Sequence, residues 1–210
     1  MSVGSRSKRR TQAQRRADSE HRLLTATAAL IVERGLNNVS LTEIGRRAGC
    51  SHALVNHLFG SKAAMIDRLN AVVDDFFTEH TRHAVEQGGV EGLLSFVEVY
   101  LQAVTGSDPI GRVHLLLWAE AVAGTPEIRP SRAARDQRFR EAVAIMVSRA
   151  ARAAKRTIDV ESTAYVIVGL IRGMAMQMLL DPASMPVAQA VGHVDRVLTG
   201  LLPRCSDHGR

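Results

Sequence analysis

The hydrophobic positions of this chain recur three or four residues apart, which is the period of an α-helix. Glycine, proline and N-capping residues separate one periodic segment from the next, and the sequence has no alternating pattern of the kind that predicts strands. The pattern therefore predicts an all-α protein with about nine helices. The expected helices are 12–34, 41–48, 52–59, 61–86, 90–104, 109–123, 131–156, 160–180 and 186–202.

The two short helices at 41–48 and 52–59 have well-defined ends. Ser40 and Glu43 have the spacing of a capping box, so the first of them is expected to begin directly after Ser40. Gly49 is expected to end it in the left-handed conformation, and Ser51 to cap the second. Two short helices joined by so tight a turn are typical of a helix-turn-helix.

The second of these helices has one apolar and one polar face by its i, i+4 spacing. The apolar positions are Leu54, Val55, Leu58 and Phe59, and the opposite positions are His52, Ala53, Asn56 and His57. Asn and His side chains form hydrogen bonds with base edges or phosphates, and a small Ala permits close approach to a thymine methyl. This face favours DNA recognition, although an ordinary helical hairpin with a solvated face has the same pattern.

Charge distinguishes the two interpretations. Between Met1 and Lys62 the chain has 11 Lys and Arg and 4 Asp and Glu, a net charge of +7. The rest of the chain carries −1, so the entire formal excess of +6 lies on the segment with the motif. Basic residues release counterions from phosphates and supply most non-specific affinity for nucleic acid. Motif and charge together predict a DNA-binding domain.

The segment from about Arg16 to Asp67 resembles the DNA-binding domain of the TetR family of bacterial transcriptional regulators. The matching residues are Gly35-Leu36, SLTEIGRRAGCS at 40–51 and VNHLFGSKAAM at 55–65. The resemblance implies that Thr42 opens a helix contacting the DNA backbone, that 52–57 lies in the major groove, and that Lys62 meets a phosphate. Ser61, as the N-cap of the next helix, also makes this helix start a favourable phosphate seat. The predicted DNA contacts are Thr42, Arg46, Ser51, His52, Ala53, Asn56, His57 and Lys62.

The resemblance further implies three parts: a basic arm at 1–15, the helix-turn-helix domain at 16–62, and a regulatory and dimerisation domain at 63–210. The last two helices have apolar residues spaced alternately by four and three, at Val160, Ala164, Ile167, Ile171, Met174 and Met178 and at Val187, Val191, Val194, Leu198 and Leu201. Each seam fits another helix. Both can be satisfied within one chain, but the family favours a homodimer through 160–180 and 186–202 as a four-helix bundle.

The family also implies a pocket for a small-molecule effector, of unknown identity, among the middle helices. The candidate lining residues are aromatic, soft or polar positions on otherwise apolar helices: Phe96, Tyr100, His114, Trp118, Glu120, Phe139, Arg172, Met176 and Gln177. Arg172 is the only charge between Glu161 and Asp181, so it requires a partner, either Glu120 or another carboxylate, or an anionic group on the ligand. The segment at 173–182 resembles a subgroup related to the choline-pathway repressor, which usually has an acidic residue where Arg172 stands.

Other functions fit less well. The N-terminus lacks an apolar secretory signal, so a cytoplasmic location is expected, and the apolar run 164–180, interrupted by Arg172 and Gln177, is interpreted as a buried helix and not a membrane span. No spacing of Cys or His predicts a metal site, and no cofactor is expected. The sequence predicts a ligand-responsive repressor that binds double-stranded DNA at an inverted-repeat operator as a dimer. An architectural DNA binder and an enzyme are the alternatives.

Overall fold

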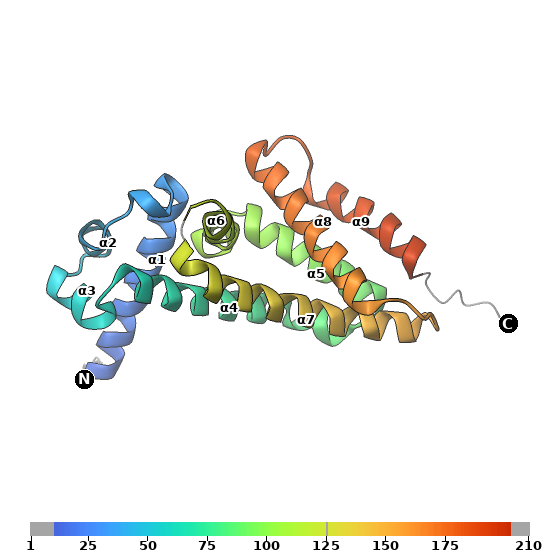
Figure 1. Ribbon diagram of the computed structural model, residues 1–210, viewed down its shortest axis with the longest axis horizontal. Helices are drawn as coiled ribbons and strands as arrows, with labels where there is room; N and C mark the ends of the chain where they lie inside the picture. Colours follow the sequence, from blue (N-terminus) through green and yellow to red (C-terminus); the bar gives the residue numbers. More distant parts are fainter. Residues whose placement is uncertain (1–10, 125, 203–210) are drawn as a thin grey trace, which may run out of the picture. The chain divides into compact units, whose positions relative to one another are not determined.

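The computed structural model describes residues 11–124 and 126–202 (Figure 1). Within these residues it contains nine α-helices, two short 3₁₀ segments and no strand, which confirms the all-α prediction. Residues 1–10 of the expected basic arm lie outside the described part, whereas residues from Gln12 onward belong to the first helix. The helices are α1 Gln12–Arg34, α2 Leu41–Ala48, α3 His52–Phe59, α4 Lys62–Gln87, α5 Gly89–Thr105, α6 Pro109–Ala123, α7 Arg129–Ala153, α8 Val160–Leu180 and α9 Val187–Leu201.

Helix α7 differs most from its predicted bounds of 131–156. It starts at Arg129 with Pro130 in its first turn, where proline is tolerated because its missing N–H would have no helical acceptor. At the other end Lys155 has a φ of 52°, and the backbone N–H of Arg156 donates to the Ala151 carbonyl at 2.9 Å. A non-glycine residue in the left-handed region thus ends the helix. The sequence has no glycine at this point to indicate where the helix ends.

The chain divides into two compact units, Met1–Leu69 and Asn70–Arg210. The division falls inside α4, whereas the sequence reading set the boundary at its start. In the first unit α2 contacts both α1 and α3. Its core consists of side chains that are at most 2% exposed, among them Leu23, Leu30, Ile31, Ile44, Val55, Met65 and Leu69.

The second unit is built around α5, which contacts α6, α7, α8 and α9, while α7 also packs along α8. Helices α5 and α6 approach each other closely at Gly111. A Cβ atom built on Gly111 would lie 2.1 Å from the Ala103 carbonyl oxygen, so only glycine fits at this crossing. The core of the unit therefore depends on one position without a side chain as well as on apolar residues such as Leu101, Leu115 and Val143.

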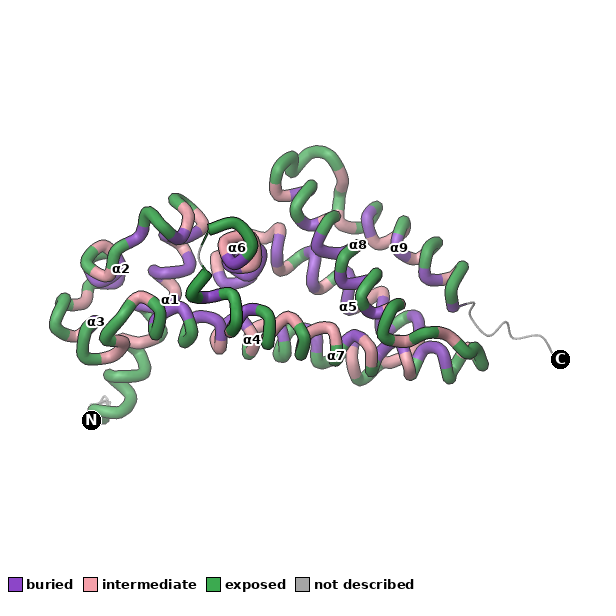
Figure 2. Tube along the Cα trace, in the orientation of Figure 1, coloured by how far each residue is buried: buried purple, intermediate pink, exposed green. Residues whose placement is uncertain are grey.

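The 4-3 seams of the last two helices are satisfied mostly inside the chain. On α8 Ala164, Ile167, Ile171 and Met178 are buried, and on α9 Val194 and Leu198 are buried, so these positions do not form a surface for a second chain. Buried and exposed positions alternate along both helices (Figure 2). We call the large apolar side chains that remain exposed on them the α8–α9 patch: Tyr165, Val166, Met176, Leu180, Val197 and Leu201. Of these, only Leu201 belongs to a predicted seam.

Helix α8 is long and apolar enough to cross a membrane, with a mean hydropathy of 1.5 over its best window. Its buried face, however, packs against α5 and α7, and Arg172 in its middle is 8% exposed. The packing of this helix into the core of the second unit accounts for its composition.

Candidate nucleic-acid interface and ligand site

The turn between α2 and α3 has the predicted geometry. Ser40 Oγ accepts a hydrogen bond from the Glu43 N–H at 3.3 Å, and Glu43 Oε2 accepts one from the Ser40 N–H at 3.0 Å, which completes the capping box. Gly49 is left-handed, with φ 65° and ψ 35°. Ser51 Oγ accepts from the Leu54 N–H at 3.2 Å. Each end of the pair is therefore fixed by local chemistry.

Helix α3 presents its polar face to solvent. His52, Ala53, Asn56 and His57 are all exposed, whereas Val55 is fully buried. Asn56 Nδ2 and His52 Nδ1 lie 3.2 Å apart, so the two side chains hold each other on this face. Thr42, Arg46 and Ser51 are exposed as well, at the ends of the same two helices. Donors, acceptors and a small apolar group are displayed together, as base and phosphate contacts require.

Lys62 has a structural role that the sequence did not indicate. Its ammonium donates to the Leu36 carbonyl at 2.6 Å, and the side chain is half-buried. Ser61 caps α4 as predicted, with Ser61 Oγ accepting from the Ala64 N–H at 3.1 Å. The fold brings the Leu36 carbonyl to Lys62 across the first unit, so the residue anchors the 3₁₀ segment Leu36–Asn38, and its phosphate contact stays a prediction.

Two other arginines of the first unit are held by glutamates. Arg34 pairs with Glu43 at 3.1 Å and Arg47 with Glu33 at 2.6 Å. The hydrogen bond from Arg47 lowers the pKa of Glu33, and hydrogen bonds from Ser40 lower that of Glu43. Arg46 is exposed in the last turn of α2 and is therefore the arginine of this helix best placed for a phosphate.

The second unit contains a cluster of buried polar side chains, which we call the polar cluster. Its members come from α4, α5, α6, α7 and α8: Asn70, Tyr100, His114, Arg132, Asp136 and Arg172. Tyr100 is fully buried, and His114, Arg132 and Arg172 are 4%, 3% and 8% exposed. Charged groups at this depth are costly unless they have partners, so their hydrogen bonds define the site.

Arg132 connects two helices to α7. Its Nη1 donates to Asn70 Oδ1 at 3.0 Å, and its Nη2 lies 2.9 Å from His114 Nδ1. Burial lowers the pKa of Arg132 to about 10, so the guanidinium stays charged at neutral pH. Burial, with Arg132 and Arg172 nearby, holds the pKa of His114 well below its ordinary value of 6.5. Neutral His114 accepts at Nδ1 and therefore carries its proton on Nε2.

Arg172 forms an ion pair with Asp136, the carboxylate that the sequence did not identify. The other oxygen of Asp136 pairs with Arg140. The Arg172 guanidinium also lies over two aromatic rings, 5.7 Å from the Trp118 centroid and 5.3 Å from that of Phe139. An intramolecular cation thus occupies the space beside both rings.

The predicted ligand residues divide into two groups. Six lie together, because the ring of Phe139 is 5.8 Å from those of Phe96 and Tyr100 and 6.0 Å from His114, while Trp118 and Arg172 adjoin it as described. Glu120 is half-buried on α6, whereas Met176 and Gln177 are exposed on α8. The sequence missed Asn70, Arg132 and Asp136, which lie in polar stretches of α4 and α7, where nothing distinguishes a buried polar residue from a solvated one.

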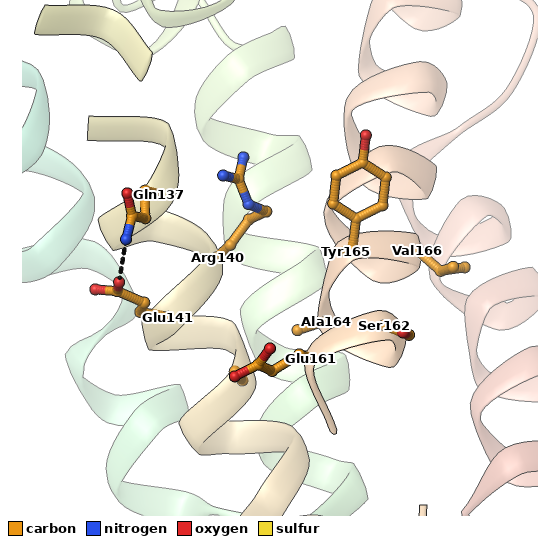
Figure 3. A pocket seen from close by; sticks show the side chains of 9 residues that line it. Gln137, Arg140, Glu141, Glu161, Ser162, Ala164, Tyr165 and Val166 are labelled. Atoms are coloured by element: carbon orange, nitrogen blue, oxygen red, sulfur yellow. Dashed lines mark hydrogen bonds between the residues drawn. The ribbon is translucent and has the colours of Figure 1, made fainter. Parts of the chain in front are cut away.

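Two pockets lie in the second unit, and one of them includes members of the polar cluster. One, of about 410 Å³, lies between α6 and α7 and is lined by Trp118, Ala121, Val122, Arg129, Arg132, Ala133 and Asp136. The other, of about 570 Å³, lies between α7 and α8 (Figure 3), where Arg140 faces Tyr165 at 5.8 Å from the ring centroid. The lining of the first pocket includes Arg132 and Asp136 of the polar cluster and the Trp118 ring beside Arg172. The first pocket is therefore the candidate ligand site.

A capped helix-turn-helix unit with an exposed polar face, joined to a second all-helical unit with a buried polar cluster, defines the class of one-component DNA-binding regulators. The family model described as "Bacterial regulatory proteins, tetR family" matches residues 23–69. The model described as "BetI-type transcriptional repressor, C-terminal" matches residues 89–203, more than half of the chain. The chain belongs to the TetR family and has a BetI-type C-terminal domain.

Individual relatives are more distant. The chain is 27% identical to the HTH-type transcriptional regulator BetI of Paraburkholderia phytofirmans over 107 residues, which span 50% of this chain and about half, 55%, of that relative. A transcriptional regulator from Pseudomonas aeruginosa is similar in structure, with a TM-score of 0.74, 23% identity and 94% of each chain covered. A regulator from Saccharomonospora viridis in complex with choline has a TM-score of 0.69, 22% identity, and covers 87% of this chain and 96% of its own. These structural likenesses establish the fold.

Proposed function

We propose that the protein represses transcription as a homodimer bound to an inverted-repeat operator in the cytoplasm, and that a small molecule in the second unit releases the DNA. The observation that carries the DNA-reading part is the exposed face of His52, Ala53, Asn56 and His57 on α3. In a helix-turn-helix the second helix enters the major groove, and dimers read half-sites about 34 Å apart. We assign contacts with the sugar-phosphate backbone of the DNA to Thr42, Arg46, Ser51 and Lys62.

The α8–α9 patch supports the homodimer. Leu180 is 89% exposed and Tyr165 67%, and large apolar side chains exposed to this degree favour an interaction site. Gly169 and Gly173 on α8 have open space where a Cβ would stand, so a second helix can approach the backbone closely. An isologous contact through this patch would bring α8 and α9 of two chains together.

The dimer is tested by sedimentation of Leu180→Glu, with Ile145→Glu as the matched control. Ile145 is 54% exposed on α7, outside the patch. Burying an unpaired carboxylate in an interface is strongly unfavourable, so Leu180→Glu is expected to be monomeric at a concentration at which the wild type and Ile145→Glu are dimers. A dimeric Leu180→Glu protein would place the interface elsewhere.

The DNA-reading assignment is tested by fluorescence anisotropy with genomic fragments from around the gene. The wild type is expected to prefer one fragment. Asn56→Ala should lower that preference by roughly tenfold, since a base contact is worth about 1–3 kcal/mol. Arg46→Ala should weaken binding to all fragments alike and reduce the slope of log affinity against log salt concentration by about one. Arg156→Ala, in the second unit, should change neither quantity. Binding without sequence preference would indicate an architectural DNA binder, and turnover of a substrate would indicate an enzyme.

A further inference from the structure

We infer that the effector carries an anionic group on an apolar body, and that the pocket between α6 and α7 receives it with this group at Arg132 and Arg172. The inference rests on the proposed ligand-responsive function and specifies the chemical class of the ligand. It follows from the hydrogen-bonding state of the polar cluster, from its charge and from the lining of the pocket.

The polar cluster has more buried donors than acceptors. Nε and Nη2 of Arg172 and Nε of Arg132 have no hydrogen-bond partner among the described residues. The same is true of Asn70 Nδ2 and of His114 Nε2, which bears the proton because Nδ1 receives Arg132. The Tyr100 hydroxyl interacts with Arg172 as an acceptor and keeps its own proton to donate. Among the acceptors, Asp136 Oδ1 pairs with Arg172 by charge but also lacks a hydrogen bond. A buried donor without a partner is unfavourable, and more so when it is charged. These donors favour a ligand rich in acceptors.

The cluster also has an excess of positive charge. Arg132 and Arg172 are both nine-tenths buried or more, and the carboxylate paired with Arg172 is Asp136, which Arg140 shares. Asp74, the other carboxylate near Arg132, pairs with Arg135 and also lies 3.8 Å from Arg138. Histidine 114 contributes no charge at neutral pH. One anionic group would therefore balance the buried charge, whereas a cationic ligand would add to it.

The pocket supplies an apolar wall beside these donors. Ala121, Val122, Ala133 and the Trp118 ring line it together with Arg132 and Asp136, and its volume of about 410 Å³ suits a small molecule. Arg172 lies directly behind two of these residues, as the partner of Asp136 and over the Trp118 ring. An anion in this pocket would therefore lie against Arg132, with Arg172 behind the Asp136 carboxylate.

The same geometry disfavours a quaternary ammonium. Aromatic rings bind such ligands through their faces, but here the guanidinium of Arg172 already lies over Trp118 and Phe139. The choline-bound regulator from Saccharomonospora viridis has the same fold, so similarity of fold does not fix the ligand. In this chain the residue beside the rings selects against that charge.

Trp118 provides the assay, because it is the only tryptophan of the chain and lines the pocket. The full-length dimer is titrated, without DNA, with four probes that share an eight-carbon tail: octanoate, octyl phosphate, octanol and octyltrimethylammonium. Octanoate or octyl phosphate is expected to change the Trp118 emission until it saturates. The affinity taken from this titration is expected to be at least tenfold higher than that of octanol. Octyltrimethylammonium is expected to give no saturable change.

Two variants test the assigned groups. Arg172→Met keeps an apolar side chain between the rings, and Tyr100→Phe removes only a hydroxyl. Each is expected to lower the affinity for the tighter-binding anionic probe about tenfold or more, since a hydrogen bond to a charged group is worth about 1.5–3 kcal/mol. Arg152→Met, an exposed arginine at the end of α7, is the control and leaves the affinity unchanged.

Tighter binding of octyltrimethylammonium than of both anions overturns the inference. So does the absence of any anionic response, which would mean that buried water satisfies the donors. The outcome is separable from the proposed function. If anions bind saturably but leave the operator affinity unaltered, the anion site stands and the proposal that a ligand releases the DNA is wrong. If a cationic ligand releases the DNA, the proposed regulatory function stands and the anion site is wrong.

Discussion

The ion pair between Arg172 and Asp136 leads to the prediction that removing one partner destabilises the fold more than removing the other. Asp136→Asn leaves the Arg172 guanidinium buried, with Arg132 nearby and no counter-charge of its own. Arg172→Met leaves Asp136 with Arg140, which is 32% exposed and reaches solvent. Removing one partner of a buried ion pair costs about 3–5 kcal/mol, whereas replacing a buried charge by a hydrophobic side chain of similar volume is often close to neutral.

We therefore expect Asp136→Asn to lose about 3 kcal/mol of unfolding free energy and Arg172→Met about 1 kcal/mol. For a chain of this size each kcal/mol corresponds to roughly 2–4 °C in Tm. The methionine also stays in contact with the Trp118 and Phe139 rings, which favour a nearby sulfur. The larger loss should thus follow removal of the negative partner, although both variants break the same ion pair.

The measurement is urea denaturation followed by circular dichroism, at one fixed protein concentration because dimerisation contributes to stability. Arg152→Met serves as the control, since Arg152 is exposed near the end of α7. Equal losses for the two variants, or a larger loss for Arg172→Met, would show that Arg172 stabilises the core by packing alone. The argument from its unsatisfied charge would then be wrong.

Three further predictions concern stability. Ser40→Ala removes the acceptor for the Glu43 N–H and should cost about 1 kcal/mol in urea denaturation. Ser107→Ala, at an exposed position that caps no helix, is the comparison. Gly111→Ala places a Cβ 2.1 Å from the Ala103 carbonyl and should lower Tm by several degrees, whereas Gly192→Ala, with open space, should not. Because the pKa of His114 is lowered in the folded state, the unfolded chain binds more protons just below its ordinary pKa of 6.5, so stability falls as pH decreases from there by up to about 1.4 kcal/mol per pH unit. His114→Asn, which keeps an acceptor for Arg132, should remove this dependence, and an unchanged pH profile would contradict it.

Local signals predicted the helices and the exposed polar face of α3. The N-caps include Ser40, Ser51, Asp108 and Asp159, and a cap depends on residues only two or three positions away. The polar face of α3 follows from helical spacing alone. Such features lie within the range over which a sequence is directly informative, because no distant contact competes with them.

Features that depend on distant contacts were not predicted. The 4-3 spacing in α8 correctly located a helix-packing face but did not reveal that the packing partners, α5 and α7, belong to the same chain. Asp136 lies in the charged stretch around 135–141 of α7, where nothing marks it as the partner of Arg172. The hydrogen bond from Lys62 to the Leu36 carbonyl likewise joins positions far apart in sequence. Each depends on which helices become neighbours.

The contacts of α7 suggest how occupancy of the pocket would affect DNA binding. Arg132 lines the pocket and donates to Asn70, and Arg135, one turn on, pairs with Asp74, so α7 holds α4 at two consecutive turns. Helix α4 begins at Lys62 in the DNA-binding unit and continues through both residues. A ligand that draws Arg132 away from Asn70 would therefore change the support of a helix shared by both units. Coupling of about 1–3 kcal/mol is typical of allosteric proteins and is within the range of one hydrogen bond to a charged group. Asn70→Ala should accordingly reduce the effect of a bound effector on operator affinity. It should also tighten effector binding, because the ligand no longer has to break the hydrogen bond between Arg132 and Asn70. An equal effector response in wild type and variant would exclude this route.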